Sequence, residues 1–304
     1  MKRTMLAGIA LCMAALCQAA MPTVESVEKV ALPDGMTVAA ATLSPDGSFA
    51  VVTPLSGSGL QRLDLGNGKV TEISKTGSQM MLQISEDGNT VVFRESSYDQ
   101  NHRRYVALKS FNFNNGSATT LVEPSRNLQG FVLDGNQAVA VDNGRKQIKT
   151  VAGVDKASVG RVALSISQGK LFVTDPSGNT FEIAPLGKEC GSYLWPVLSP
   201  DGTTIAAFGV GTGTFVCDLA GNNVKVLGMY RAPQWLDNNT IVAMDDYDNG
   251  VKTIKSSIVA LNADGSEKSV LTSDDVVAVF PSASQNKVAF TTPDGELYIM
   301  NLKK

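Results

Sequence analysis

Short apolar runs, separated by turn residues, recur along most of the chain. Runs such as "FAVV", "TVVF", "TIAAF" and "TIVAM" are four or five residues long, and each directly follows a turn. Runs of this length and composition are typical of β-strands that are covered on both faces. No helical periodicity is found after residue 20. The pattern therefore predicts an all-β protein.

The turns recur at a mean spacing of about 40 residues. Asp-Gly pairs supply the positive φ angles that tight hairpins need, and four strands per unit of this length are the signature of a β-propeller blade. We therefore predict a single propeller over residues 21–304, with seven blades. The third and fourth turn spacings are only 34 and 33 residues, so these two units could instead form one irregular blade of a six-bladed ring. The seven turns are Asp46-Gly47, Asp87-Gly88, Asp134-Gly135, Gln168-Gly169, Asp201-Gly202, Asp237-Asn238 and Gln285-Asn286.

The two ends of the chain predict how the ring closes. The last unit stops after three strands, while residues 24–32, "VESVEKVAL", form a lone strand with no unit of their own. A strand edge that is left unpaired invites association with other chains. We expect residues 24–32 to supply the outer strand of the last blade.

Several repeats carry a recognisable motif. The stretches "LSPDGSFAVV", "ISEDGNTVVF", "LSPDGTTIAAF" and "APQWLDNNTIVAM" resemble the repeat of TolB-type propellers, which are WD-repeat-like. The resemblance extends over nearly the whole chain after residue 20. It implies a propeller fold. In TolB an α/β domain precedes the propeller, and we expect none here because the chain leaves no room for it. The motif itself marks a scaffold turn and implies no catalytic residue.

The first 20 residues have the features of a secretory signal peptide. Lys2 and Arg3 precede an apolar run over residues 5–16, which ends in small residues, and cleavage is expected after Ala19 or Ala20. The cysteines of this segment follow leucine, which argues against a lipoprotein anchor. We expect a soluble periplasmic or extracellular protein.

The charge balance limits the classes of partner. Without Lys2 and Arg3 the chain has 24 basic and 29 acidic residues, a net charge of −5. A nucleic-acid-binding protein would carry a basic patch, so we expect no nucleic acid partner. No later stretch has the length of a membrane span, and a monomer is expected.

The sequence holds no complete catalytic or metal site. His102 is the single histidine, and no Gly-x-Ser-x-Gly motif is present. In "MDDYDNGVK", Tyr247 occupies position 3, where a calcium loop that began at Asp245 would need a ligand. Cys190 and Cys217 are placed at opposite ends of their blade, too far apart for a disulfide, so we expect free thiols. We expect no metal and no cofactor.

Two long middle connections indicate a binding face. Residues 94–105 and 245–256 exceed the other connections between middle strands, and insertions on one face of a repeat array usually mark its binding side. In a seven-bladed ring these segments lie across the channel mouth from each other, and together they would form a cleft with one basic and one acidic side. The alternative is that both are solvated hairpins with no binding role. The candidate binding residues are Tyr98, His102, Arg103 and Arg104 in the first, Asp245, Asp246, Tyr247 and Asp248 in the second, and Tyr193, Tyr230 and Arg231 in the segments that lead into blades five and six.

These observations favour a non-catalytic extracytoplasmic binding or scaffold protein with a protein or peptide partner, which could be a component of the cell envelope. Two alternatives remain open at this stage. One is a propeller enzyme, such as a calcium-dependent hydrolase or lactonase with carboxylates in its channel. The other is a sensor or assembly part of an envelope complex.

Overall fold

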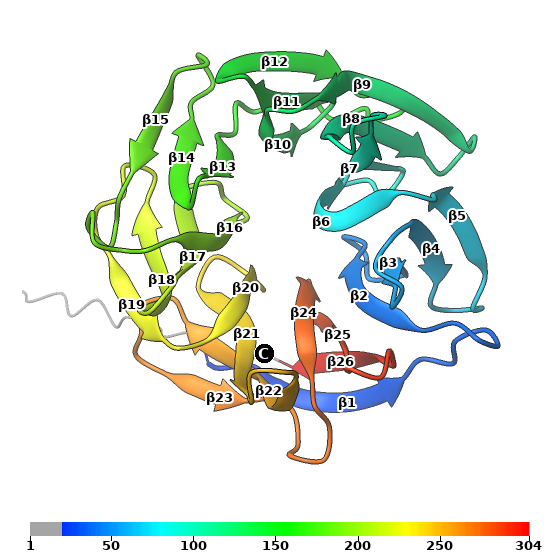
Figure 1. Cartoon of the computed structure of the whole chain (residues 1–304). Coiled ribbons are helices and arrows are strands. Elements are labelled where there is room, and N and C mark those ends of the chain that lie inside the picture. Colours follow the sequence, from blue (N-terminus) through cyan, green and yellow to red (C-terminus); the bar gives the residue numbers. More distant parts are fainter. Residues whose placement is uncertain (1–19, 304) are drawn as a thin grey trace, which may run out of the picture.

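The computed structural model describes residues 20–303 and shows seven β-sheets arranged as blades around one axis (Figure 1). The described residues contain no α-helix, which confirms the all-β prediction. The seven separate sheets confirm the predicted count of seven blades. No helix in this part of the chain is long and apolar enough to cross a membrane. The structure is therefore a single seven-bladed propeller.

Five blades have four antiparallel strands each. The first holds β2 (Val38–Leu43), β3 (Phe49–Pro54), β4 (Leu60–Asp64) and β5 (Val70–Ser74), and the second holds β6 (Gly77–Ile84), β7 (Thr90–Tyr98), β8 (Arg104–Asn112) and β9 (Ser117–Ser125). The fifth holds β16 (Tyr193–Leu198), β17 (Thr204–Gly209), β18 (Gly213–Asp218) and β19 (Lys225–Gly228), and the sixth holds β20 (Arg231–Trp235), β21 (Thr240–Asp248), β22 (Thr253–Asn262) and β23 (Lys268–Val270). The seventh holds β24 (Val279–Ser284), β25 (Lys287–Thr291), β26 (Leu297–Lys303) and β1 (Thr23–Lys29).

The third and fourth blades have only three strands each, which corrects the expectation of four strands in every unit. In each of these blades the third strand is followed directly by a connection without strand, residues 151–162 in the third blade and 184–192 in the fourth. The two units nevertheless form separate sheets, so the six-bladed alternative is wrong. The third blade holds β10 (Leu128–Asp134), β11 (Gln137–Asp142) and β12 (Arg145–Thr150), and the fourth holds β13 (Ala163–Ser167), β14 (Lys170–Thr174) and β15 (Thr180–Ile183).

The Ser-Pro-Asp-Gly repeat builds the turn between the first two strands of a blade. The hydroxyl of Ser44 donates to the Asp46 carboxylate at 2.6 Å and accepts the backbone N–H of Phe49 at 3.1 Å. This bond from Ser44 holds the pKa of Asp46 below its ordinary value. Gly47 follows with a φ of 65°, which a glycine adopts without strain. The same arrangement recurs in the second and fifth blades. The motif is therefore structural.

The N-terminal strand closes the ring, as the sequence predicted. β1 pairs antiparallel with β26, from Thr23 opposite Lys303 to Lys29 opposite Tyr298. The two strands lie side by side at the outer edge of the seventh blade (Figure 1). Lys29 also pairs with Glu296 at 2.5 Å. The first and last strands of the described residues are thus held in one sheet.

The core lies between the blades rather than inside any one of them. Seven clusters of buried apolar side chains are found, and each takes its members from two neighbouring blades. A flat sheet covered on both faces needs apolar residues at consecutive positions, which explains the runs in the sequence. The smallest cluster lies between the two three-stranded blades and consists of Val132, Val139, Val141 and Ala163.

Candidate functional site

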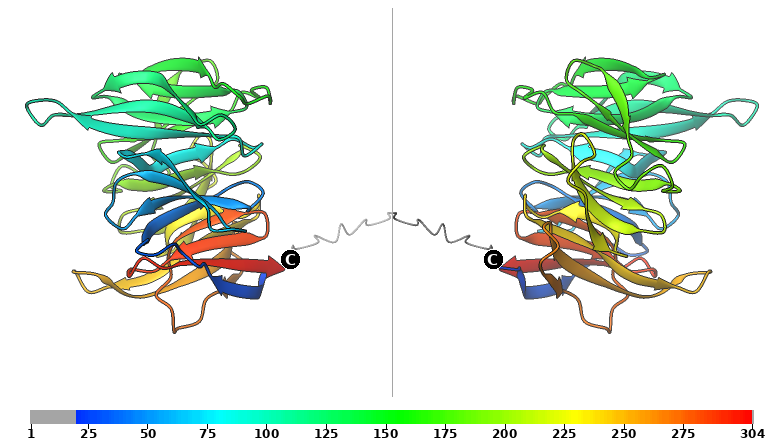
Figure 2. Two further views of the ribbon diagram at one scale, coloured as in Figure 1. Left: turned by 90° about the vertical axis from the view of Figure 1, so that its right-hand side faces the viewer. Right: turned by 90° about the vertical axis from the view of Figure 1, so that its left-hand side faces the viewer.

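Two β-hairpins project from the same face of the ring, one from blade two and one from blade six (Figure 2). β7 and β8 remain paired out to Tyr98 and Arg104, whereas the inner strand β6 begins opposite Glu95. In the sixth blade, β21 is paired with β22 out to Asp248, whereas β20 begins opposite Met244. The two hairpins stand on opposite sides of the ring (Figure 1). We call this side of the propeller the hairpin face.

Residues 94–105 and 245–256 were expected to be long connections between strands, but most of these residues belong to strands. Only residues 99–103 and 249–252 lie outside the strands. The extra length therefore extends the two middle strands beyond their blade. Because a paired hairpin has fewer conformations than a free loop, its tip side chains are held at defined positions relative to the ring.

The tip of the first hairpin presents an aromatic ring and two guanidinium groups to solvent. Tyr98 is 66% exposed, and His102, Arg103 and Arg104 are exposed as well. The Asp99 carboxylate accepts the backbone N–H of Arg103 at 2.9 Å, which fixes the turn. Every predicted candidate residue of this hairpin is therefore available for contact with another molecule.

The second hairpin is more apolar at its tip than its sequence suggested. Tyr247 is 63% exposed, and Val251 and Ile254 are exposed beside it. The Asp248 carboxylate accepts the backbone N–H of Gly250 at 2.5 Å and thereby caps the turn. Apolar side chains held in solvent on a rigid hairpin are typical of a protein-binding surface.

The acidic character predicted for the second hairpin is largely neutralised. Asp245 lies 3.8 Å from the ammonium of Lys268. Asp246 pairs with Arg231. Two of the three aspartates thus have basic partners from other segments. The first hairpin is basic, as expected, but the second is nearly neutral rather than acidic. The basic partners, Arg231 and Lys268, lie on β20 and β23, so the local sequence of the hairpin does not show that they neutralise its aspartates.

Arg231 and Asp246 form a partly buried ion pair beneath the second hairpin. The guanidinium Nη1 lies 2.7 Å from the carboxylate Oδ2, and the Asp246 side chain is 1% exposed against 41% for Arg231. Oδ1 of Asp246 is buried and has no hydrogen-bond partner among the described residues. Burial raises the pKa of Asp246, although the positive charge of Arg231 opposes the shift. This pair therefore belongs to the scaffold of the hairpin as well as to its surface.

The candidate residues that lead into blades five and six differ in their exposure. Tyr193 is only 4% exposed, and its hydroxyl accepts the backbone N–H of Leu186 at 3.1 Å, so the expectation that it contacts a ligand is wrong. Its ring packs against Phe215 between blades four and five. Tyr230 is half-buried, with the Lys268 ammonium 5.2 Å from the centre of its ring. Sequence position alone did not show which way either ring points.

Three consecutive inner strands share an X-Pro bulge that the sequence analysis missed. Trp195, Ala232 and Phe280 each precede a proline and have φ angles of 49°, 50° and 51°. The pairing register shifts at each of these places, and proline fits a bulge because it has no N–H to donate. The signal that could have found it is the recurrence of Trp-Pro, Ala-Pro and Phe-Pro at one position of successive repeats.

The bulges lie beside exposed apolar side chains at the same ends of blades five to seven. Leu194, Val210, Met229 and Phe280 are all exposed. The pairing of Tyr193 with Gly209 and the bond from Val210 N to Ser192 O place the first two at the hairpin end of blade five. Backbone strain of about 1–3 kcal/mol per residue is usually retained where it serves a site. The hairpin face thus continues across three neighbouring blades.

Cys190 and Cys217, the two cysteines within residues 20–303, are free thiols in the structure. Cys217 pairs in register with Ile205 at one end of β17, whereas the sulfur of Cys190 lies at the other end, near Gly209. Burial raises the pKa of Cys217 to about 12, so this thiol is not a nucleophile at neutral pH. The expectation of two unpaired, separated thiols is confirmed.

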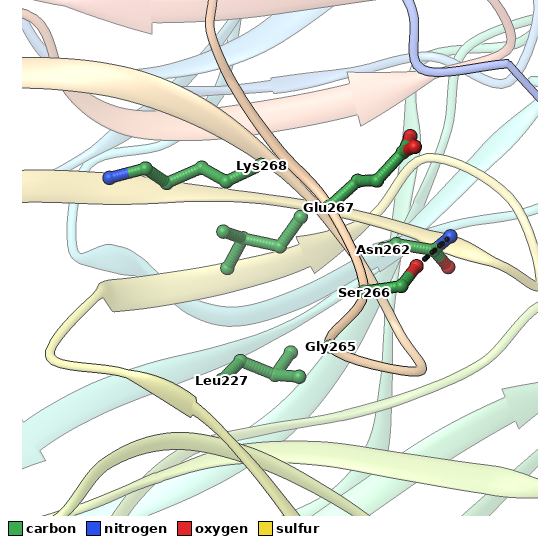
Figure 3. Close-up of a pocket in the computed structure, with 7 residues that line it drawn as sticks. Leu227, Asn262, Gly265, Ser266, Glu267 and Lys268 are labelled. Carbon is green, nitrogen blue, oxygen red and sulfur yellow. Dashed lines mark hydrogen bonds between the residues drawn. The ribbon is translucent and has the colours of Figure 1, made fainter.

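A small pocket lies away from the hairpin tips, beside the turn that joins β22 and β23 (Figure 3). Its volume is about 180 Å³, and it is lined in part by Leu227, Gly265 and Lys268. Asn262 donates to the hydroxyl of Ser266 across the turn at 3.1 Å. Ligand pockets usually have volumes of about 300–1,000 Å³, so this one is a gap beside a scaffold turn. Within residues 20–303 no group of three or more His, Cys, Asp or Glu side chains could hold a metal ion.

No protein-family model matches the chain, and no curated protein matches its sequence. Many solved structures share its architecture, including these two. A chain of the crystal structure of the mitotic checkpoint complex superposes with a TM-score of 0.61 and 11% sequence identity, covering 100% of this chain and 99% of that chain. The structure of a putative TolB from Agrobacterium tumefaciens superposes with a TM-score of 0.55 and 16% identity, covering 88% of this chain and 91% of that chain. The chain has a TolB-like, WD-repeat-like propeller fold. The resemblance seen in the repeat is thereby confirmed at the level of the fold.

Proposed function

We propose that the protein is a non-catalytic binding scaffold that holds a protein or peptide partner on its hairpin face. The observation that carries the proposal is the projection of two rigid hairpins from one face, each with a solvent-exposed tyrosine, Tyr98 and Tyr247. Tyrosine combines a large contact area with few rotatable bonds, and it is enriched among the residues that dominate binding energies. The exposed apolar residues at blades five to seven extend the same surface.

The charges on this face support recognition more than affinity. Arg103 and Arg104 are exposed at one tip, where Arg104 Nε donates to the Ser96 hydroxyl at 3.1 Å, whereas two of the three aspartates of the other hairpin pair with basic residues. Exposed charges at the rim of an interface steer a partner and raise the association rate, while desolvated aromatic side chains supply most of the binding energy. The partner surface that fits is apolar at its centre with acidic groups toward the first hairpin.

We expect the Tyr98→Ala/Tyr247→Ala variant to lose the partner that the wild-type protein captures from an envelope extract. Each tyrosine should contribute about 1–3 kcal/mol, so the double variant should bind more weakly by a factor of at least about 30. The melting temperature should remain unchanged because both side chains are exposed. Pull-down with quantitative mass spectrometry, followed by titration of the recovered partner, measures the loss.

Phe181→Ala provides the matched control, because Phe181 is an exposed aromatic residue on β15, at the outer edge of blade four. This variant should retain the partner. Binding that persists after both tyrosines are replaced, or that maps to the Asp-Gly turns on the opposite face, would contradict the proposal.

We further propose that this scaffold works outside the cytoplasm after removal of residues 1–20, a segment of which only residue 20 lies within the described structure. The support is the basic, apolar and small-residue order of that segment. We expect the exported product to begin at Ala20 or Met21. Intact mass measurement of the periplasmic or secreted protein tests this, and an acylated N-terminus at Cys17 would refute the soluble form.

A further inference from the structure

The third blade ends in a strand whose outer edge is open. β12 forms the rim of the ring at the top of Figure 1, and it is the last strand of a three-stranded sheet. Among the described residues, no backbone hydrogen bond reaches β12 from its outer side. Five of the seven blades have a fourth strand at this position. The geometry of the ring therefore has room for one more strand here.

The register identifies the groups that are free. Asn143 and Gly144 form a two-residue turn with φ angles of 53° and 70°, so Asp142 and Arg145 form the first hydrogen-bonded pair of the hairpin. Bonded and non-bonded pairs alternate along an antiparallel ladder. The N–H and C=O groups that point outward consequently belong to Lys146, Ile148 and Thr150.

The seventh blade shows that such an edge can accept a strand from a distant segment. Its outer strand, β1, comes from the other end of the chain and pairs antiparallel with β26. Most side chains of β1 are exposed, so this strand is held largely by backbone pairing. The same mode of attachment is open to an extended segment of another molecule at β12.

A groove beside the edge gives the added strand a second contact surface. A cavity of about 520 Å³ lies between β9 and β12 and is lined in part by Val122, Pro124 and Lys149. On the other face of the strand Ile148 is 50% exposed, which leaves an apolar side chain uncovered next to the free edge. A strand added here would cover both.

The charge of β12 selects the occupant. Three of its six residues are basic and none is acidic. The Lys146 ammonium donates to the carbonyl of Pro176, whereas no carboxylate lies within ion-pair distance of Arg145 or Lys149 in the described residues. Two copies of β12 paired edge to edge would place like charges opposite one another, which is unfavourable. Asp142, at the end of the groove, already accepts bonds from Ser125 and Gln147.

We propose that β12 is a strand-addition site for an extended, acidic segment of a partner protein. The segment pairs with the outward groups of Lys146, Ile148 and Thr150, places carboxylates beside Arg145 and Lys149, and covers Ile148 with an apolar side chain. This surface lies on the rim and is separate from the hairpin face, so the proposal does not depend on the function proposed above.

The first test uses capped octapeptides in which Asp or Glu alternates with Val, Ile or Thr. We expect a member of this set to bind the full chain and to protect the backbone amides of Lys146, Ile148 and Thr150 from hydrogen exchange. N-methylation of the peptide amides that face β12 should weaken binding by about tenfold or more, the effect of losing about one net hydrogen bond. N-methylation of the alternate amides should leave binding unchanged.

Charge variants provide the second test. Arg145→Glu and Lys149→Glu should each weaken peptide binding by about tenfold or more, because each replaces an attraction with a repulsion. Lys252→Glu at the tip of the second hairpin changes the net charge equally and should have no effect. Ile148→Pro removes one outward N–H without touching the bonds to β11, and it should abolish binding while the melting temperature changes little.

Three outcomes would overturn the proposal. One is equal binding of the two N-methylated peptides, which would indicate charge attraction alone. Another is the absence of binding by every acidic peptide of the set. The third is a dimer of the wild-type chain in sedimentation that Ile148→Pro dissociates, because the occupant would then be a second copy.

Discussion

Deletion of residues 21–33 should make the protein insoluble or lower its melting temperature by about 10 °C or more. The deletion removes β1, which is bonded along β26, together with Val30 and Leu32, which pack against the core between blades seven and one. Each lost backbone bond costs about 1 kcal/mol, and each of the two partly buried apolar side chains costs less than the roughly 1.5–3 kcal/mol of full burial. Several kcal/mol in a chain of this size correspond to a shift of this magnitude.

The matched experiment supplies the missing strand separately. A synthetic peptide of residues 21–33 should restore the melting temperature of the deleted protein, whereas a scrambled peptide of the same composition should not. Calorimetry or thermal unfolding followed by circular dichroism measures both. An unchanged unfolding curve after deletion would show that the ring does not depend on this closure.

Arg231→Met should destabilise the protein by about 2–3 kcal/mol, whereas Asp246→Asn should change its stability by less than about 1 kcal/mol. Removal of the arginine leaves a carboxylate that is 1% exposed without its counter-ion. Breaking a fully buried ion pair costs about 3–5 kcal/mol. We expect a smaller loss of stability here because Arg231 is 41% exposed and water screens the pair. Removal of the aspartate leaves a guanidinium that solvent still reaches.

The pH dependence follows from the direction of the pKa shift. Burial raises the pKa of Asp246, so the folded state binds a proton more tightly than the unfolded state does. This contribution to stability is fully present below the unfolded pKa of about 3.9 and is lost as the pH rises through the folded pKa. Arg231→Met should raise that pKa further, so the deficit of the variant should shrink as the pH falls from about 7 to about 4.

Chemical denaturation at several pH values checks both parts of this prediction. The Arg231→Met/Asp246→Asn double variant should recover most of the lost stability. Lys170→Met, which breaks the exposed pair with Glu182, is the control and should cost less than about 1 kcal/mol. A deficit in Arg231→Met that is independent of pH would mean that lost packing, rather than the uncompensated charge, is the cause. Because of this structural role, Tyr247 is a cleaner probe of binding than Arg231.

The sequence predicted the repeat because its signals are local. A tight turn requires a residue with positive φ, which the glycine of an Asp-Gly pair supplies. The serine of the same motif makes its hydrogen bonds to residues no more than five positions away. Apolar runs reflect burial on both faces of a blade, which every repeat needs for the same reason. Closure was also predictable, since the last unit lacked one strand and the first segment was a strand without a unit.

The site was predictable only in part. The exposed positions of Tyr98 and Tyr247 follow from the length of two connections. The burial of Tyr193 does not, because a side chain beside the mouth can point toward either the channel or the neighbouring blade. The ion-pair partners of Asp245 and Asp246 lie 23 and 15 residues away in the chain, so the sequence could not predict that these two charges are neutralised.

The sequence alone therefore determined an all-β ring of repeated blades, the turns that build it, the strand that closes it and the two connections that extend from it. Only the tertiary structure decided which blades lack an outer strand, how the hairpin charges are paired and which aromatic rings are exposed. The first group depends on bonds between residues near one another in the chain and on burial that every repeat shares. The second depends on side chains from different blades that meet once the ring has closed.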